Sequence, residues 1–213
     1  MTGFPASLAR LVTGLEAPEL PAAFAGRTFD YAELGTGREA AVLVLLTGEP
    51  DVVLIERALT MRKHPGQIAF PGGAIDPTDP DPAAAALREA WEEIGLAPSA
   101  VTVLGQLPPA RIPVSRFHVH GVVGWWDGES TLRPDPAEVA SVRRVPVADL
   151  VDPANRTTWR HPATGRTGPG FTSGELYVWG FTAYVLDTVL AAGGWQRPWD
   201  ASRIVDVPAR FMA

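Results

Sequence analysis

The sequence contains no cysteine, and this absence removes several kinds of chemistry at once. Without thiols the chain cannot form a disulfide, bind zinc through thiolates or use a thiol nucleophile. Lysine is nearly absent as well, because Lys63 is the only one and almost all positive charge is on arginine. Any chemistry must therefore come from oxygen and nitrogen groups.

Long apolar runs are also lacking, although 46% of the residues are hydrophobic. No uncharged apolar stretch approaches the ~18 residues of a membrane-spanning helix. Residues 1–10 lack the basic and apolar regions of a signal peptide, so a soluble, cytoplasmic protein without membrane contacts is expected. A net charge of -6 argues against nucleic acid as a partner. Small anions remain as candidate ligands.

The hydrophobic pattern predicts a mixed α/β fold without a regular βαβ repeat. Strands are expected at residues 41–47, 51–57, 67–70, 101–107, 117–126 and 139–145, and helical segments at residues 4–15, 82–94, 147–151 and about 182–192. The first two strands should form a hairpin around Gly48-Glu49-Pro50, and Pro71-Gly72-Gly73 should make a sharp turn. Residues 152–174 are polar and rich in Gly, Pro and Thr, which predicts a long loop or flap.

The length of 213 residues predicts a single domain spanning residues 1–213. No composition shift marks a domain boundary. The helices at residues 4–15 and 182–192 are expected to be accessory elements. In the first of them, Leu8, Leu11 and Leu15 recur at helical spacing and should pack on the main body.

Residues 82–94 carry the strongest helix signal of the chain. Asp81 is a suitable N-cap, Pro82 suits the first helical position, and Gly95 can end the helix in a left-handed conformation. The alanines in the first half are strong helix formers. We therefore expect a helix with these bounds.

The second half of this helix is acidic. A rotation of about 100° per residue places Leu87, Trp91 and Ile94 on one side and Glu89, Glu92 and Glu93 on the opposite side. Carboxylates this close together repel one another, and a hard divalent cation such as Mg²⁺ or Mn²⁺ relieves the repulsion. Arg88 can form an ion pair with Glu92. Composition alone favours an ordinary solvated acidic face.

Residues 72–96, GGAIDPTDPDPAAAALREAWEEIGL, resemble the Nudix box, G-x5-E-x7-R-E-U-x-E-E-x-G-U, where U is a bulky aliphatic residue. The matching residues are Gly73, Arg88, Glu89, Glu92, Glu93, Gly95 and Leu96. Asp79 replaces the first glutamate, one extra residue separates it from Arg88, and Ala90 is smaller than the usual aliphatic residue. The resemblance implies a Nudix fold, in which a mixed β-sheet is sandwiched between helices (α/β/α).

Residues 53–73, VLIERALTMRKHPGQIAFPGG, resemble L-L-T-x-R-[S/A]-x3-R-x3-G-x3-F-P-G-G, the motif of the coenzyme A pyrophosphatase branch of the Nudix superfamily. The matching residues are Arg57, Ala58, Arg62, Gly66, Phe70, Pro71, Gly72 and Gly73, and Ile55 replaces a threonine. The resemblance implies that Arg57, Arg62, Gly66 and Phe70 bind substrate. Guanidinium groups are suited to clamping the phosphate oxygens of coenzyme A.

The same resemblance implies a metal-dependent diphosphatase that produces adenosine 3′,5′-bisphosphate and (acyl-)4′-phosphopantetheine. The implied metal ligands are Gly73, Glu89, Glu92 and Glu93, with Mg²⁺ or Mn²⁺ as the cofactor. Glu89 is expected to take the proton of the attacking water, with Arg88 and Glu92 beside it. Some Nudix enzymes use a glutamate outside the box, and Glu138 is the candidate here.

The sequence is also compatible with other functions. The substrate could be ADP-ribose, NADH or a nucleoside triphosphate, or the chain could bind a nucleotide without hydrolysing it. A scaffold that binds calcium or a protein partner on its acidic face would require both motifs to be accidental. His118 and His120 share one face of a predicted strand, but without a third ligand we expect structural roles. Nudix enzymes are often dimers, so a homodimer is possible.

Overall fold

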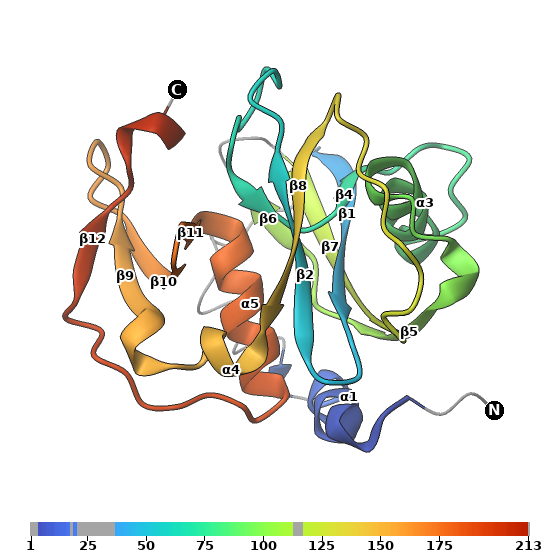
Figure 1. Cartoon of the computed structure of the whole chain (residues 1–213), viewed down its shortest axis with the longest axis horizontal. Coiled ribbons are helices and arrows are strands. Elements are labelled where there is room, and N and C mark those ends of the chain that lie inside the picture. The colour runs from blue at the N-terminus through green and yellow to red at the C-terminus, as the bar shows by residue number, and fades with distance from the viewer. Residues whose placement is uncertain (1–3, 18, 21–36, 113–116, 213) are drawn as a thin grey trace.

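An eight-stranded mixed sheet forms the centre of the computed structural model, which describes residues 4–17, 19–20, 37–112 and 117–212 (Figure 1). Its strands are β1 (Arg38–Leu46), β2 (Asp51–Arg57), β3 (Ile68–Ala69), β4 (Gly72–Ala74), β5 (Val101–Gln106), β6 (Ala110–Ile112), β7 (Phe117–Trp126) and β8 (Val139–Pro146). The central order is β3-β2-β1-β7-β5, with β4 beside β1, β6 beside β7 and β8 beside β2. The predicted hairpin of β1 and β2 is confirmed, whereas β1 and β7 pair in parallel.

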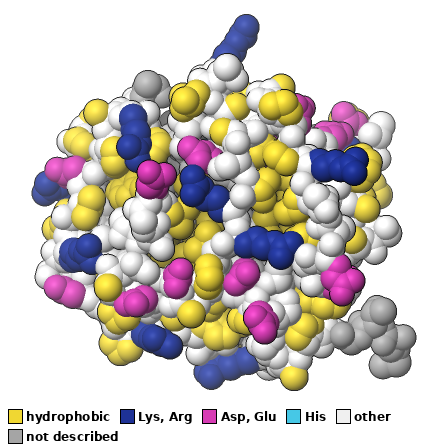
Figure 2. All heavy atoms as spheres, in the orientation of Figure 1, with side chains coloured by type: hydrophobic (Ala, Val, Ile, Leu, Met, Phe, Trp, Pro, Cys, Tyr) yellow, Lys and Arg dark blue, Asp and Glu magenta, His cyan; other side chains and the backbone are white. Residues whose placement is uncertain are grey.

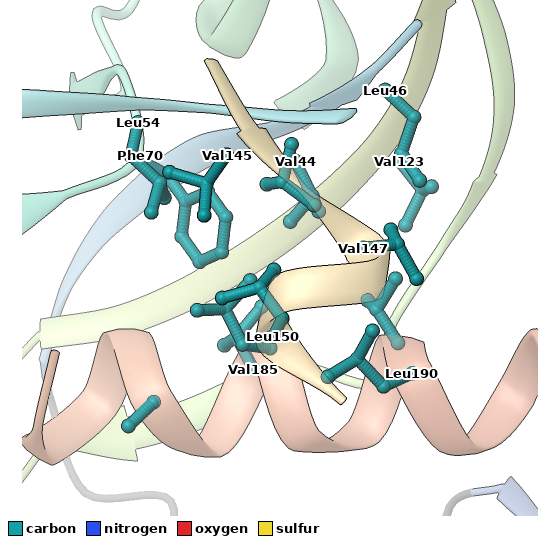
Figure 3. Close-up of a cluster of buried hydrophobic side chains, with 14 of the residues drawn as sticks. Val44, Leu46, Leu54, Phe70, Val123, Val145, Val147, Leu150, Val185 and Leu190 are labelled. Atoms are coloured by element: carbon teal, nitrogen blue, oxygen red, sulfur yellow. The ribbon is translucent and has the colours of Figure 1, made fainter. Parts of the chain in front are cut away.

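Helices cover both faces of this sheet. The helices are α1 (Ala9–Leu15), α3 (Pro82–Ile94), α4 (Val147–Leu150) and α5 (Gly180–Ala192). Because side chains of a strand alternate between faces, Leu43 and Leu45 of β1 pack on the α3 side, and Val44 packs on the α5 side. The core on the α5 side is drawn in Figure 3, where strand residues meet Leu150 of α4 and Val185 of α5. This arrangement confirms the predicted α/β/α class.

The N-terminal helical segment packs against α5. A short 3-10 helix (Ala6–Leu8) leads into α1, so the helix predicted from residue 4 begins slightly later. The three predicted leucines are buried, and a Cβ on Gly14 would clash with the Ala192 carbonyl of α5. None of the helices in the described part of the chain has the length and hydropathy needed to cross a membrane. Figure 2 shows acidic and basic side chains interspersed over one face, with hydrophobic side chains between them.

Helix α3 has the predicted bounds and caps. The Asp81 carboxylate accepts a hydrogen bond of 2.8 Å from the Ala84 amide, and Pro82 occupies the first turn. Gly95 ends the helix at φ 69°, where a residue with a Cβ is strained. Local signals are sufficient to define this helix.

The buried face of α3 covers only part of the apolar side that the sequence indicates, because Ile94 is buried and Trp91 is not. Trp91 is 54% exposed, whereas Glu93 is only 3% exposed. The face turned to the sheet consists mainly of Ala85, Ala86 and Ala90, whose small side chains allow the helix to lie close to the strands. The same rotation brings Glu93 against the backbone of β4.

The loop or flap predicted for residues 152–174 is also wrong, because most of this segment belongs to a second sheet. That sheet has the order β11-β10-β9-β12 and consists of β9 (Arg156–Arg160), β10 (Thr167–Ser173), β11 (Leu176–Val178) and β12 (Ile204–Asp206). Trp159 and Phe171 are buried in it, and Gly170 allows β9 to lie close, since a Cβ there would approach Thr157 Oγ1 to 2.7 Å. Helix α5 lies between the two sheets in Figure 1.

A buried ion pair connects the second sheet to α5. Arg156 Nη2 donates a hydrogen bond of 2.6 Å to Asp187 Oδ1, and the Arg156 side chain is 1% exposed. Its guanidinium lies over the rings of Phe171 and Trp199. Removing one charge of such a pair leaves the other buried and uncompensated.

We expect Asp187→Asn to lower the free energy of unfolding by about 3 kcal/mol, because the buried Arg156 charge loses its partner. Urea denaturation measures this loss. The control is Asp206→Asn, which removes an exposed ion pair with Arg160 and should cause no measurable change. Equal losses in the two variants would contradict the assigned role of the buried pair.

Candidate active site

The acidic side of α3 meets strand β4 and the end of β2. Arg57, the last residue of β2, has its Nη1 atom 4.0 Å from Oε1 of Glu93. The Gly72 amide donates a hydrogen bond of 2.9 Å to Oε2 of the same glutamate. The two sequence motifs are therefore in contact in the folded chain, through a carboxylate that is almost fully buried.

Two glycines allow this close approach. The predicted turn is limited to a bend at Pro71, after which Gly72 and Gly73 belong to β4, which pairs with β1. A Cβ on Gly73 would lie 2.5 Å from the carboxyl carbon of Glu89. One on Gly72 would lie 2.3 Å from the Ala41 carbonyl oxygen. Neither position accepts a larger residue without displacing the strand or the carboxylate.

Arg88 connects the acidic groups of the site. It donates hydrogen bonds of 3.1 and 2.9 Å to the two carboxylate oxygens of Asp79, and bonds of 3.0 Å to Glu89 and Glu92. A further bond of 3.1 Å reaches the Ala74 carbonyl. The hydrogen bond from Arg88 holds the pKa of Asp79 below its ordinary value. The shorter aspartate, despite the extra residue in the loop, thus reaches the arginine in bidentate geometry.

Glu89 and Glu93 have raised pKa values. Burial is the main cause for both, and the negative charge of nearby Glu138 adds to it. Arg88 opposes the rise at Glu89, whereas the Gly72 amide and Arg57 oppose it at Glu93, whose pKa reaches about 7. Since Glu138 acts on both carboxylates, it lies within electrostatic range of the pair.

The donor set fits a hard divalent cation, because it consists of carboxylates whose mutual repulsion a cation would relieve. Because Gly73 has no side chain, its backbone lies close to the Glu89 carboxylate. In the described ranges, however, no three acidic or imidazole side chains are arranged to hold a metal ion. Glu89 and Glu92 are bonded to Arg88 and Glu93 to the Gly72 amide, so these hydrogen bonds must rearrange when a cation binds.

The remaining residues of the second motif lie in different surroundings. Gly66 has φ 67° and donates its amide to the Arg57 carbonyl, which closes the loop after β2. Arg62 is exposed on this loop. Phe70 is 3% exposed and packs in the core on the α5 side (Figure 3), rather than facing the carboxylates.

One cluster was missed by sequence reasoning. The Glu39 carboxylate is hydrogen-bonded to two imidazoles, with Oε1 at 3.0 Å from His118 Nδ1 and Oε2 at 2.8 Å from His120 Nε2. Burial alone would raise the pKa of Glu39, but the bonds to the two imidazoles outweigh it and hold that pKa below its ordinary value. The parallel register of β1 and β7 sets Glu39 opposite His118. No local signal reveals a pairing between strands so distant in the sequence.

The chain is similar to known proteins of one family. The NUDIX domain model matches residues 37–164. A protein from Enterobacter sp. (strain 638) named "Uncharacterized Nudix hydrolase NudL" is 40% identical over 157 residues, covering 70% of this chain and 79% of that relative. Its namesake from Cronobacter sakazakii is 47% identical over 116 residues, which is 54% of this chain and 60% of that relative.

Two solved structures share the fold. The Nudix hydrolase RenU from M. smegmatis superposes with a TM-score of 0.54 at 20% identity, covering 76% of this chain and 89% of that chain. A NUDIX hydrolase from Alicyclobacillus acidocaldarius gives 0.50 at 23% identity, covering 76% and 94%. At these identities the likeness extends to the fold alone.

The raised pKa of Glu93 predicts a pH-dependent stability. Since its pKa of about 7 in the folded chain exceeds the ordinary 4.5, the stability it contributes is full below pH 4.5 and is lost as pH rises through 7. In chelator-treated protein, Glu93→Gln should remove this loss, on the order of 3 kcal/mol. Urea denaturation between about pH 5 and pH 8 measures it.

The control is Glu129→Gln, which alters an exposed carboxylate that does not belong to α3. Its stability should follow that of the unmodified protein at every pH. If the stability of Glu93→Gln also changes with pH in parallel with that of the unmodified protein, the pKa of the buried Glu93 carboxylate is not raised.

Proposed function

This chain belongs to the NUDIX domain family, and we propose that it hydrolyses the diphosphate bond of coenzyme A or an acyl-coenzyme A. As a Nudix hydrolase it acts on pyrophosphate bonds. Its proposed products are adenosine 3′,5′-bisphosphate and (acyl-)4′-phosphopantetheine.

The contact between Arg57 and Glu93 carries the proposal. The first residue belongs to the motif that resembles coenzyme A pyrophosphatases, and the second belongs to the acidic helix. A guanidinium at this position can hold one phosphate oxygen of a diphosphate whose scissile bond lies beside the carboxylates. Arg62, exposed on the same loop, is assigned to a second phosphate group. Gly66 gives this loop its closed conformation.

Nudix hydrolases generally use divalent metal ions, and Mg²⁺ or Mn²⁺ is the proposed cofactor. Gly73, Glu89, Glu92 and Glu93 are the proposed ligands. Bound there, the cation supplies positive charge against the diphosphate oxygens. Glu89 is the proposed base, because its partial burial raises its pKa and thereby strengthens it as a proton acceptor. Arg88 is a positioning residue that orients Glu89 and Glu92, and Glu138 is a second candidate base.

The proposal is tested by product analysis. Purified protein with Mg²⁺ or Mn²⁺ is incubated in parallel with coenzyme A, ADP-ribose, NADH and a nucleoside triphosphate, and the products are separated by chromatography. We expect adenosine 3′,5′-bisphosphate from coenzyme A and little turnover of the others. Cleavage of another diphosphate instead would contradict the substrate assignment, and no cleavage of any would favour a binding role.

Two variants separate binding from chemistry. Glu89→Gln should lower kcat by roughly 10²- to 10⁴-fold, the usual contribution of a general base. Arg57→Gln should raise KM for coenzyme A by roughly 10-fold or more, since it removes a charge-assisted hydrogen bond. Arg203→Gln is the control, because this exposed arginine bonds to the Ala154 carbonyl beside the second sheet. A normal KM in Arg57→Gln would remove the basis for choosing coenzyme A.

A further inference from the structure

A cavity of about 610 Å³ lies between the two sheets, next to the loop that carries the second motif. Its wall includes Leu59 and Gly66 of that loop, Leu176 and Tyr177 of β11, and Phe211 near the C-terminus. None of the carboxylates of α3 lines it. The cavity is therefore separate from the proposed site of hydrolysis, although both adjoin the same loop.

The alternation of side chains along β2 connects the cavity with the proposed site of hydrolysis. Arg57 faces Glu93 on the α3 side, whereas its neighbour Glu56 lines the cavity on the opposite face. Residues 58–67 form the edge between them, and the Gln67 side chain donates a hydrogen bond of 3.1 Å to the Phe211 carbonyl. A substrate whose diphosphate lies beside Arg57 can thus extend one arm across this edge into the cavity.

The wall of the cavity suits an uncharged ligand. It contains two carboxylates and two guanidinium groups, from Glu56, Glu175, Arg143 and Arg210. Arg143 Nη2 donates a hydrogen bond of 2.9 Å to Glu56 Oε2, so part of this charge is already paired. The wall has no net charge to attract a phosphate, and most of its exposed area is apolar. Leu59, 79% exposed, adds apolar surface.

Two buried polar atoms of the wall have no partner among the described residues. These are the hydroxyl oxygen of Tyr177, a residue only 7% exposed, and Nε of Arg143. A buried donor without a partner costs about 1–3 kcal/mol. Because both atoms are closed to solvent in this structure, a ligand carbonyl recovers this cost only when the side chain turns toward the cavity. Burial raises the pKa of Tyr177 to about 12, so its hydroxyl keeps its proton and can donate.

We infer that this cavity binds the pantetheine arm of the substrate, with amide carbonyls of the arm accepting hydrogen bonds from Tyr177 and Arg143. The arm is neutral, and its aliphatic segments match the apolar wall formed by Leu59, Ile68 and Phe211. The inference rests on the proposed function, because it assigns one end of the proposed substrate. The adenosine end, which carries the additional phosphate, remains on the side of Arg57.

The test is calorimetric titration of the whole protein with free pantetheine, which has no phosphate. Tyr177→Phe removes only the hydroxyl and should weaken binding by roughly 3- to 10-fold, the equivalent of one hydrogen bond. KM for coenzyme A should rise by the same factor, with kcat and the inhibition constant of adenosine 3′,5′-bisphosphate unchanged. Tyr184→Phe is the matched control, since that hydroxyl bonds to the Thr167 carbonyl and does not line the cavity.

A second variant blocks the cavity. Thr172 lines it from β10 and is only partly buried, so an indole in Thr172→Trp should fill the space and abolish pantetheine binding while the thermal unfolding temperature is maintained. The inference is overturned if pantetheine does not bind the unmodified protein. It is also overturned if Tyr177→Phe and Thr172→Trp both bind pantetheine as tightly as the unmodified protein does.

The two proposals fail in different ways. Pantetheine binding that depends on Tyr177, without any cleavage of coenzyme A, would support the cavity assignment and contradict the proposed function. Cleavage of coenzyme A without pantetheine binding would support the proposed function and overturn the cavity assignment.

Discussion

The repulsion between carboxylates on one side of α3 is the constraint on which the site depends. Glu89 and Glu93 are partly or almost fully buried because α3 lies close to Gly72 and Gly73 of β4. This burial raises the pKa of both carboxylates. Arg88 neutralises part of the charge by bonding to three acidic side chains. A folded chain that keeps repelling acids together at a cost in stability is suited to binding a cation and its phosphate ligands.

The end of β2 lies between the acidic side of α3 and the cavity between the sheets. Consecutive residues there face opposite sides, so Arg57 lies beside Glu93 of α3 and Glu56 lines the cavity between the sheets. The second sheet and the C-terminal segment complete that cavity, and Gln67 links the segment to the motif loop. The architecture therefore offers one place for charged groups and one for a neutral chain, as the proposed binding of coenzyme A requires.

Local signals predicted the parts of the structure that local interactions determine. The caps of α3, the β1–β2 hairpin and the strand from Phe117 to Trp126 needed only neighbouring residues. The second sheet was missed because its glycines and threonines are strand residues only when paired. The burial of Glu93 instead of Trp91 depends on how closely α3 approaches β4. The bonds of Glu39 to two histidines depend on the parallel pairing of β1 and β7.

Manganese binding to Gly73→Ala tests the central claim most directly. The substitution keeps every carboxylate but places a methyl group where the Glu89 carboxylate now lies. Electron paramagnetic resonance counts free Mn²⁺ in titrations of both proteins. We predict that the unmodified protein binds Mn²⁺ and that the variant binds it at least about 10-fold more weakly. Equal affinities, or no binding by the unmodified protein, would contradict a cation site formed by β4 and the acidic side of α3.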